Sequence, residues 1–367
     1  MDIAERDPLS KGLERVVGLE HIEPGSLHIR EWGNVADGTS FTRAFRAGQV
    51  LFGKRRAYQR KVAYAGFDGI CSGDILVFEA VSEEMMPELL PFIVQSESFF
   101  EQALQTSAGS LSPRTKWTEL AKYEFALPPK NEQRRIAEIL WAADAVVQQR
   151  DELFASLHAM SAAVDDKWFG HASKAVERVE AGAICDTTVG IVVTPAKYYV
   201  RDGVPAIRSL NVFPDRFNLD ELVHISDGGH RLHPKSQLRT GDVVIVRSGR
   251  PGDAAVIGPQ LDGANCIDLI IARPVMRLRP HYLTGFLNSE SGRRQFLRGT
   301  AGTAQKHFNL GAFRKMLIPL PPAQDQDLAV REFAEIDSAA TQVGAMRDTD
   351  IQVCKALREE LLAGTRC

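Results

Sequence analysis

Three absences narrow what this 367-residue chain can be. No run of eighteen apolar residues occurs, which argues against a membrane-spanning helix. The N-terminus, MDIAERDPLSKGLERVV, is charged and lacks the apolar core of a signal peptide, so export is not expected. The five cysteines are scattered and form no C-x-x-C pair. Their placement argues against a disulfide framework and favours a reducing, cytoplasmic location.

Motifs for catalysis are missing as well. Gly53-Lys54 resembles the end of a phosphate-binding loop, but no hydroxyl residue follows the lysine. Neither G-x-S-x-G nor H-E-x-x-H occurs. His224, His230 and His233 lie near one another, but no further ligand completes a zinc site. We therefore expect no catalytic residue, no metal and no cofactor in this chain. An enzyme with an unfamiliar site is the least favoured alternative.

What the chain does contain is a repeat. The stretch ALPPKNEQRRIAEIL has a second version, PLPPAQDQDLAVREF, and a shift of 321 − 128 = 193 places Pro321-Pro322 on Pro128-Pro129. The same shift places Gln326 on Gln133, RTGDVVI (239–245) on RAGQVLF (46–52), and GTAGT (299–303) on TSAGS (106–110). One offset that holds over this distance indicates a duplicated module with pseudo-twofold symmetry rather than chance similarity.

Each copy combines a globular part with one long helix. Short β-branched runs between turn residues predict strands at QVLFGK, GDILVFEA, DVVIVRSG and LIIARPV, and residues 87–107 and 280–300 are predicted to be helical. After each Pro-Pro pair about 40 residues continue without proline, enough for a helix of about 60 Å. Apolar residues follow a heptad-like spacing in both helices, namely Ile136, Leu140, Ala143, Val147, Phe154, Leu157, Val164 and Trp168, then Phe333, Ile336, Ala340, Val343, Leu357 and Leu361. Such narrow stripes are best buried if the two helices form an antiparallel coiled coil.

The predicted fold class is therefore α+β, with two globular domains in tandem repeat separated by two long helices. The predicted segments are a first domain at 1–127, a helix at 128–170, a second domain at 171–320 and a helix at 321–367. About thirty residues (173–205) precede the common register in the second copy, but barely a dozen do in the first. The first domain is therefore expected to be incomplete at its N-terminus.

Local basic stretches are the candidate binding sites, because a net charge of −3 does not favour nucleic-acid binding by the whole surface. GKRRAYQRK (53–61) surrounds a tyrosine with cations, and VRSGRPGD (246–253) takes the corresponding place in the second copy. SAGSLSPRTKWTEL (107–120) and TAGTAQKHFNLGAF (300–313) precede the two Pro-Pro pairs, and AIRSLNV (206–212) is a weaker candidate. Arginine and lysine suit phosphate or guanine, whereas asparagine and glutamine suit adenine. The alternatives are a solvated turn for the first stretch and packing at the helix root for the second.

The expected DNA-contacting residues are the polar and basic side chains of these stretches together with two upstream arginines. They are Arg43, Arg46, Lys54, Arg55, Arg56, Tyr58, Arg60, Lys61, Arg114, Lys116, Arg208, Asn211, Arg247, Ser248, Arg250, Thr303, Gln305, Lys306, His307 and Asn309.

With its two variable domains, each followed by a Pro-Pro helix start with a glutamine, the sequence resembles the specificity (S) subunits of type I restriction–modification systems over nearly its whole length. LPPKNEQRRIAEIL matches the central region of that family closely. LPPAQDQDLAV matches less well, because Asp325 replaces a glutamate and Leu328-Ala329 replaces a basic-Ile pair.

The resemblance implies a non-catalytic, DNA-binding subunit of a bacterial defence and DNA-modification complex. Each target recognition domain would read one half of an interrupted double-stranded target, while the helices set the unread gap and dock methyltransferase (M) subunits. S-adenosylmethionine, ATP and Mg would be bound only by the M subunits and by the restriction (R) subunits, and no membrane would be involved. The alternatives are a reader subunit of a type IIB or other phage-defence system, and a non-enzymatic scaffold whose repeated domains bind protein.

Overall fold

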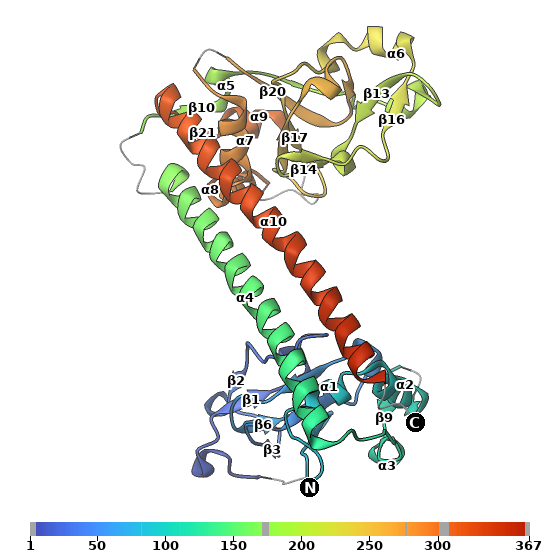
Figure 1. Ribbon diagram of the computed structural model, residues 1–367. Helices are drawn as coiled ribbons and strands as arrows, with labels where there is room; N and C mark the ends of the chain where they lie inside the picture. Colours follow the sequence, from blue (N-terminus) through green and yellow to red (C-terminus); the bar gives the residue numbers. More distant parts are fainter. Residues whose placement is uncertain are drawn as a thin grey trace. The chain divides into compact units, whose positions relative to one another are not determined.

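The structure is a computed structural model that describes residues 5–81, 83–109, 111–170, 176–275, 277–300 and 308–363 (Figure 1). The chain forms two compact units. The first unit comprises Met1–Glu152 with Ala345–Cys367, and the second comprises Leu153–Gly344. Each unit therefore includes part of both long helices, so the compact units cut across the four predicted segments. None of the helices in the described ranges is both long and apolar enough to span a membrane.

The described part of the first unit holds three small sheets and a group of helices. Its strands are β1 (Arg15–Val17), β2 (Gly33–Asn34), β3 (Arg43–Phe45), β4 (Val50–Gly53), β5 (Val62–Tyr64), β6 (Gly69–Cys71), β7 (Ile75–Phe78), β8 (Ser107–Ala108) and β9 (Arg114–Thr115). Its helices are α1 (Leu90–Val94), α2 (Glu97–Gln105), α3 (Trp117–Leu120) and the first part of α4 (Lys130–Phe169). The sheet orders are β2-β1-β6-β3 and β5-β4-β7, and β8 pairs with β9.

The second unit repeats this plan with additions. Its strands are β10 (Arg178–Glu180), β11 (Cys185–Val189), β12 (Tyr199–Val200), β13 (Val204–Ile207), β14 (Val212–Phe213), β15 (Arg216–Phe217), β16 (Val223–Ile225), β17 (Val243–Val246), β18 (Ala254–Val256), β19 (Asn265–Cys266), β20 (Leu269–Pro274) and β21 (Leu317–Pro319). Its helices are α5 (Ala181–Ile184), α6 (Asp227–Leu232), α7 (Pro280–Asn288), α8 (Glu290–Thr300), α9 (Leu310–Arg314) and the first part of α10 (Ala323–Leu361). Its four-stranded sheets have the orders β11-β20-β17-β18 and β12-β16-β13-β19.

The central strands of both units come from the apolar runs that the sequence predicts as strands. All four residues of β4 are buried, and so are all four of β17. Each lies between two antiparallel neighbours, β5 and β7 in the first unit and β18 and β20 in the second. A strand covered on both faces needs a continuous apolar sequence, which explains why VLF and VVIV do not alternate with polar residues.

The glutamine that follows each Pro-Pro pair fixes the start of the long helix. Gln133 is 1% exposed, accepts a hydrogen bond from the Met86 N–H and donates to the Glu84 and Pro128 carbonyls, all at 2.8 Å. Gln326 is 0% exposed and makes the same three bonds to backbone groups 193 residues later, each at 2.9 Å. One buried amide thus satisfies three backbone groups that would otherwise be costly to bury. This shared bonding explains why the glutamine appears in both versions of the motif.

The long helices pair antiparallel within each unit. In the first unit Arg150 on α4 contacts Asp350 on α10 at 3.2 Å, and Asp151 bonds to Arg347. In the second unit the Lys167 ammonium lies 2.7 Å from the Glu332 carboxylate, while the Phe154 ring lies beside Gly344. In both units, later positions on α4 therefore meet earlier positions on α10, which confirms the predicted antiparallel pairing. Most of the predicted seam is half-buried, but Ile136 and Leu140 are fully buried in the globular core of the first unit.

Four cysteines are free in the structure, in agreement with the absence of a disulfide framework: Cys71, Cys185, Cys266 and Cys354. Cys367 lies outside the described residues. Burial raises the pKa of Cys185 and of Cys266 to about 12, so neither thiol is a reactive nucleophile at neutral pH. Within the described ranges, no group of three or more histidine, cysteine and acidic side chains is arranged to hold a metal ion.

Candidate nucleic-acid interface

The first unit brings two separately predicted basic stretches together. Arg55, in the loop after β4, forms an isolated antiparallel bridge with Arg114 on β9. The Arg56 N–H donates to the Pro113 carbonyl at 2.8 Å, and the Arg55 side chain donates to the Ser112 hydroxyl at 2.6 Å. Residues 53–61 and 111–116 therefore form one continuous surface, which we call the first basic surface.

Asp74 organises the cations of this surface. Its carboxylate accepts two hydrogen bonds from Arg114, at 2.8 and 3.3 Å, and lies 3.5 Å from Arg55. The Arg114 guanidinium beside Asp74 is the main reason that the pKa of this carboxyl lies below its usual value, with Arg55 and Lys54 contributing. The two arginine side chains remain 40% and 50% exposed, so both can still donate to an outside acceptor. The carboxylate therefore orients the guanidinium groups without covering them.

Several predicted residues of the first unit are instead tied to its own scaffold. Arg60 pairs with Glu97 at 2.8 and 2.5 Å and lies over the Phe100 ring. Lys61 donates to the Leu19 carbonyl at 2.6 Å, and Arg43 donates to the Ile75 carbonyl. The roles of these three cations are thus explained by the fold.

Other predicted residues point to the exterior. Arg46, Arg56, Tyr58 and Lys116 are exposed, and Tyr58 shows 56% of its surface. Arg56 adopts the left-handed conformation with φ 54°, which is uncommon for a residue with a side chain. The cations Lys54, Arg55, Arg56, Arg114 and Lys116 outnumber the single carboxylate of Asp74 by four, so this patch is positive on a chain that is negative overall.

In the second unit the same scaffold position holds a buried arginine. Arg247, at the end of β17, pairs with Asp268 at 2.7 Å and donates to the Phe308 carbonyl at 3.2 Å. The Phe308 N–H donates in turn to the Arg247 carbonyl at 2.9 Å, just as the Thr115 N–H donates to the Lys54 carbonyl at 2.9 Å in the first unit. Lys54 and Arg247 are thus equivalent, and the nearby carboxylate is retained as Asp74 and Asp268. Because only 11% of its side chain is exposed, Arg247 is a structural cation more than a contact residue.

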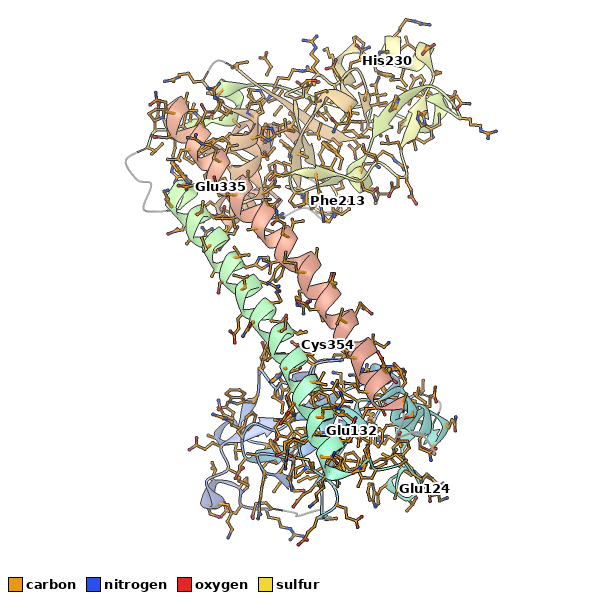
Figure 2. All side chains as sticks on the ribbon, viewed as in Figure 1. Glu124, Glu132, Phe213, His230, Glu335 and Cys354 are labelled. Carbon is orange, nitrogen blue, oxygen red and sulfur yellow. The ribbon has the colours of Figure 1, made fainter. Side chains whose placement is uncertain are left out.

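Arg250 links two further predicted stretches. Its guanidinium lies 4.0 Å from the centre of the Phe213 ring and donates to the Val212 carbonyl at 2.9 Å. Figure 2 labels Phe213, which belongs to β14. The Arg250 side chain is 43% exposed, and Ser248 beside it is half-buried. The loop after β17 and the stretch 206–212 are therefore adjacent, and we call them the second basic surface.

The two polar residues predicted in 206–212 act mainly on the backbone. Asn211 is buried, accepts from the Arg208 N–H at 2.9 Å and donates to the Asn218 carbonyl at 3.0 Å. The half-buried Arg208 side chain donates to the Glu221 carbonyl at 3.3 Å. Asn309 accepts from the Ala312 N–H at 2.8 Å and caps the short helix α9. Thr303, Gln305, Lys306 and His307 lie outside the described residues.

The sequence interpretation missed the acidic partners Asp74, Glu97 and Asp268. The repeat contained a signal for two of them. FDGICSGDIL (67–76) and LDGANCIDLI (261–270) align with one inserted residue and place Asp74 opposite Asp268. Asp74 directly precedes β7, and Asp268 directly precedes β20. A carboxylate that occurs in both copies, beside a basic loop that differs between them, is typical of a residue that orients the cations of that loop.

Comparison with known proteins agrees with this architecture. Residues 34–152 match the family model of the type I restriction modification DNA specificity domain. The specificity subunit of the type I restriction enzyme EcoDI from Escherichia coli is 25% identical over 162 residues, which are 41% of this chain and 35% of that relative. The chain thus matches just over a third of the length of this curated relative.

Two solved structures share the fold. One comes from a study of complex assembly and conformational transition of the type I R-M system; it is 20% identical, with coverage of 99% of this chain and 93% of that chain and a TM-score of 0.56. The S subunit from M. genitalium is 12% identical, with coverage of 95% and 88% and a TM-score of 0.56.

The fold and the matched domain define the class: a two-unit α+β protein whose residues 34–152 match the family model of the type I restriction modification DNA specificity domain. The chain is similar to the specificity subunits of type I restriction–modification systems, and this similarity confirms the resemblance inferred from the repeat and the Pro-Pro helix starts.

Proposed function

We propose that this protein is the non-catalytic DNA-reading subunit of a type I restriction–modification complex. Each unit would read one half of a bipartite double-stranded target, through the first and second basic surfaces respectively. The observation that carries this proposal is the matched pair of strand ends at Lys54 and Arg247. The two ends share backbone bonds and a carboxylate, but the exposed side chains that follow them differ.

A common scaffold with different loops is what reading two different half-sites requires. In the first unit the exposed groups are Arg55, Arg56 and Arg114, whose forked donors suit guanine edges and phosphates. In the second unit the loop after β17 carries fewer cations, and the Arg250 guanidinium lies over the Phe213 ring. Different donor sets should therefore select different bases.

The partners belong to the same proposal. Methyltransferase subunits would dock on the long helices and bring S-adenosylmethionine together with the catalytic residues. Restriction subunits would bring ATP hydrolysis and Mg. The long helices would also set the unread gap between the half-sites, since a 40-residue helix is about 60 Å long and one turn of DNA is about 34–36 Å.

Genome-wide mapping of methylated adenines, in the host with and without this gene, tests the proposal. We expect an interrupted two-part motif to lose methylation when the gene is deleted. Replacing Arg56 with alanine should weaken binding of the full chain to that motif by about 1–3 kcal/mol if the residue contacts a base. Lys130→Ala, at an exposed cation on the first turn of α4, is the matched control and should have little effect. Unchanged methylation after deletion would contradict the proposed function.

A further inference from the structure

The second unit contains a basic cavity whose lining residues belong to neither basic surface. Its volume is about 430 Å³, and it is lined by the end of α4 and by residues of β10, α8, α9 and β21. Four cations reach it, namely Arg178, Arg294, Arg298 and Lys315, and no carboxylate is among the residues that line it. Phe169 and Met316, both buried, supply apolar lining.

Two of these cations are engaged within the unit and two are not. Arg178 donates to the Phe169 and Gly170 carbonyls at 3.3 Å, and Arg294 pairs with Glu290 at 3.1 Å. The side chains of Arg298 and Lys315 are exposed and make no hydrogen bond or ion pair within the described part of the chain. The cavity therefore holds positive charge that nothing in the described structure neutralises.

The elements around the cavity are joined by hydrogen bonds and by a ring contact. The Gln295 side chain donates to the Leu317 carbonyl at 3.0 Å and accepts from the Leu317 N–H at 2.9 Å, joining α8 to β21. Phe169 stacks on Phe333 with ring centres 5.5 Å apart. These contacts hold the backbone segments that carry the four cations in place around the cavity.

The repeat argues that these charges are not needed by the fold. Helix α2 in the first unit matches α8 at the 193-residue offset, with Glu97 on Glu290, Ser98 on Ser291 and Gln102 on Gln295. However, the positions of Arg294 and Arg298 are Glu101 and Gln105 in α2. The same helix is built without these arginines, so their presence in α8 points to a ligand of the second unit.

The cavity also adjoins the second basic surface through α8. Phe296, two residues before Arg298 on α8, packs against Phe308 with ring centres 4.3 Å apart. Phe308 is in turn bonded to Arg247 at the end of β17. A polyanion that lies on the second basic surface could therefore continue to this cavity.

From these observations we propose that the cavity binds phosphate groups of the DNA backbone and positions the second unit on the duplex without reading bases. This inference rests on the proposed function and adds a contact outside the predicted reading loops. Arginine and lysine make most contacts of this kind, and such contacts set affinity and register rather than sequence preference.

The test measures binding of the full-length chain to a cognate duplex and to a scrambled duplex between 50 and 200 mM KCl. Replacing Arg298 and Lys315 with glutamine should lower the slope of log K against log salt by roughly 0.9 per lost phosphate contact, about 1.8 in total. Over this salt range the wild type should then lose affinity about tenfold more than the double variant. The preference for cognate over scrambled DNA should stay unchanged, because no base contact is removed.

The control carries the same change of charge elsewhere on the second unit. Arg277→Gln with Arg331→Gln removes two exposed cations that do not line the cavity, and its salt slope should match the wild type. Thermal unfolding of both double variants is followed in parallel, so that loss of the fold is recognised. A slope unchanged by Arg298→Gln with Lys315→Gln overturns the inference while leaving the proposed function standing.

Two other results separate the remaining possibilities. Calorimetric binding of inorganic pyrophosphate that the double variant abolishes, without any change in the DNA slope, assigns the cavity to a free phosphate compound and overturns the backbone contact. Absence of salt-dependent DNA binding by the wild type contradicts the proposed function itself.

Discussion

Strand β20 in the second unit has a neighbour on each side, β17 and β11, whereas its counterpart β7 in the first unit pairs only with β4 among the described strands. The five-residue ladder between β11 and β20 is replaced at β7 by side chains. Phe78 packs against Trp117 with ring centres 5.8 Å apart, and Arg43 donates to the Ile75 carbonyl. The central strands are the same in both units, so the core does not depend on how this edge is finished.

A second difference concerns the cation at the strand end. In the first unit Asp74 holds exposed arginines at a surface, whereas in the second Asp268 neutralises an arginine that is almost fully buried. One carboxylate position therefore orients a binding group in one unit and supports the fold in the other. A repeat can keep a scaffold interaction while changing what it is used for.

Removing the helix-start glutamines should have the largest effect and should be equal in the two units. Gln133→Ala and Gln326→Ala each leave three backbone groups without their partner, for a loss of roughly 3–5 kcal/mol in unfolding free energy. Hydrogen exchange of α1 and α7 peptides reports on each unit separately. Gln324→Ala, at an exposed position of the same helix start, should change little. Clearly unequal losses would break the equivalence of the two helix starts.

Neutralising the shared carboxylate should distinguish the units. Asp268→Asn removes the carboxylate that pairs with the buried Arg247 guanidinium and should destabilise the second unit by roughly 2 kcal/mol. Asp74→Asn affects exposed arginines and should cost less than about 1 kcal/mol. Exchange rates of β17 and β4 peptides give the two values. A larger loss at Asp74 than at Asp268 would reverse the interpretation of the two sites.

One equivalent pair of positions on the long helices carries groups of opposite charge, namely Asp165 on α4 and Arg358 on α10. Burial raises the pKa of Asp165 to about 6, while burial lowers the pKa of Arg358, which donates to Gln95 at 2.6 Å. A carboxyl with a raised pKa destabilises the folded state when it is ionised. The penalty is therefore present above pH 6 and disappears as pH falls towards the ordinary value near 4.

Asp165→Asn should accordingly stabilise the second unit by roughly 1–2 kcal/mol at pH 8, and the gain should shrink as pH is lowered towards 4. Denaturant unfolding at several pH values measures this dependence. Asp166→Asn, at the exposed neighbouring position, should show no comparable trend. A gain that is independent of pH would remove the ionised carboxyl as its cause.

Much of this fold could be predicted from sequence because its strongest signals are local or periodic. The apolar runs became β4, β7, β17 and β20, and the proline-free stretches became two long helices. The pairing of Arg55 with Ser112, or of Arg250 with Val212, could not be predicted, because it joins segments about 40 to 60 residues apart. Sequence also could not show which cations turn inward, since Arg60 and Arg56 lie four residues apart in the same loop and differ only in their surroundings.

The amide of Gln133 bonds to the backbone just before its own helix and to the segment that precedes α1, and the amide of Gln326 bonds in the same way just before α10 and before α7. Such a three-point attachment fixes the direction of the helix axis and also its rotational setting against the adjoining globular core. Neither helix can twist about its long axis unless that core turns with it. A protein docked on one stripe of the helix start would therefore find the neighbouring strand-end loops at a fixed angle.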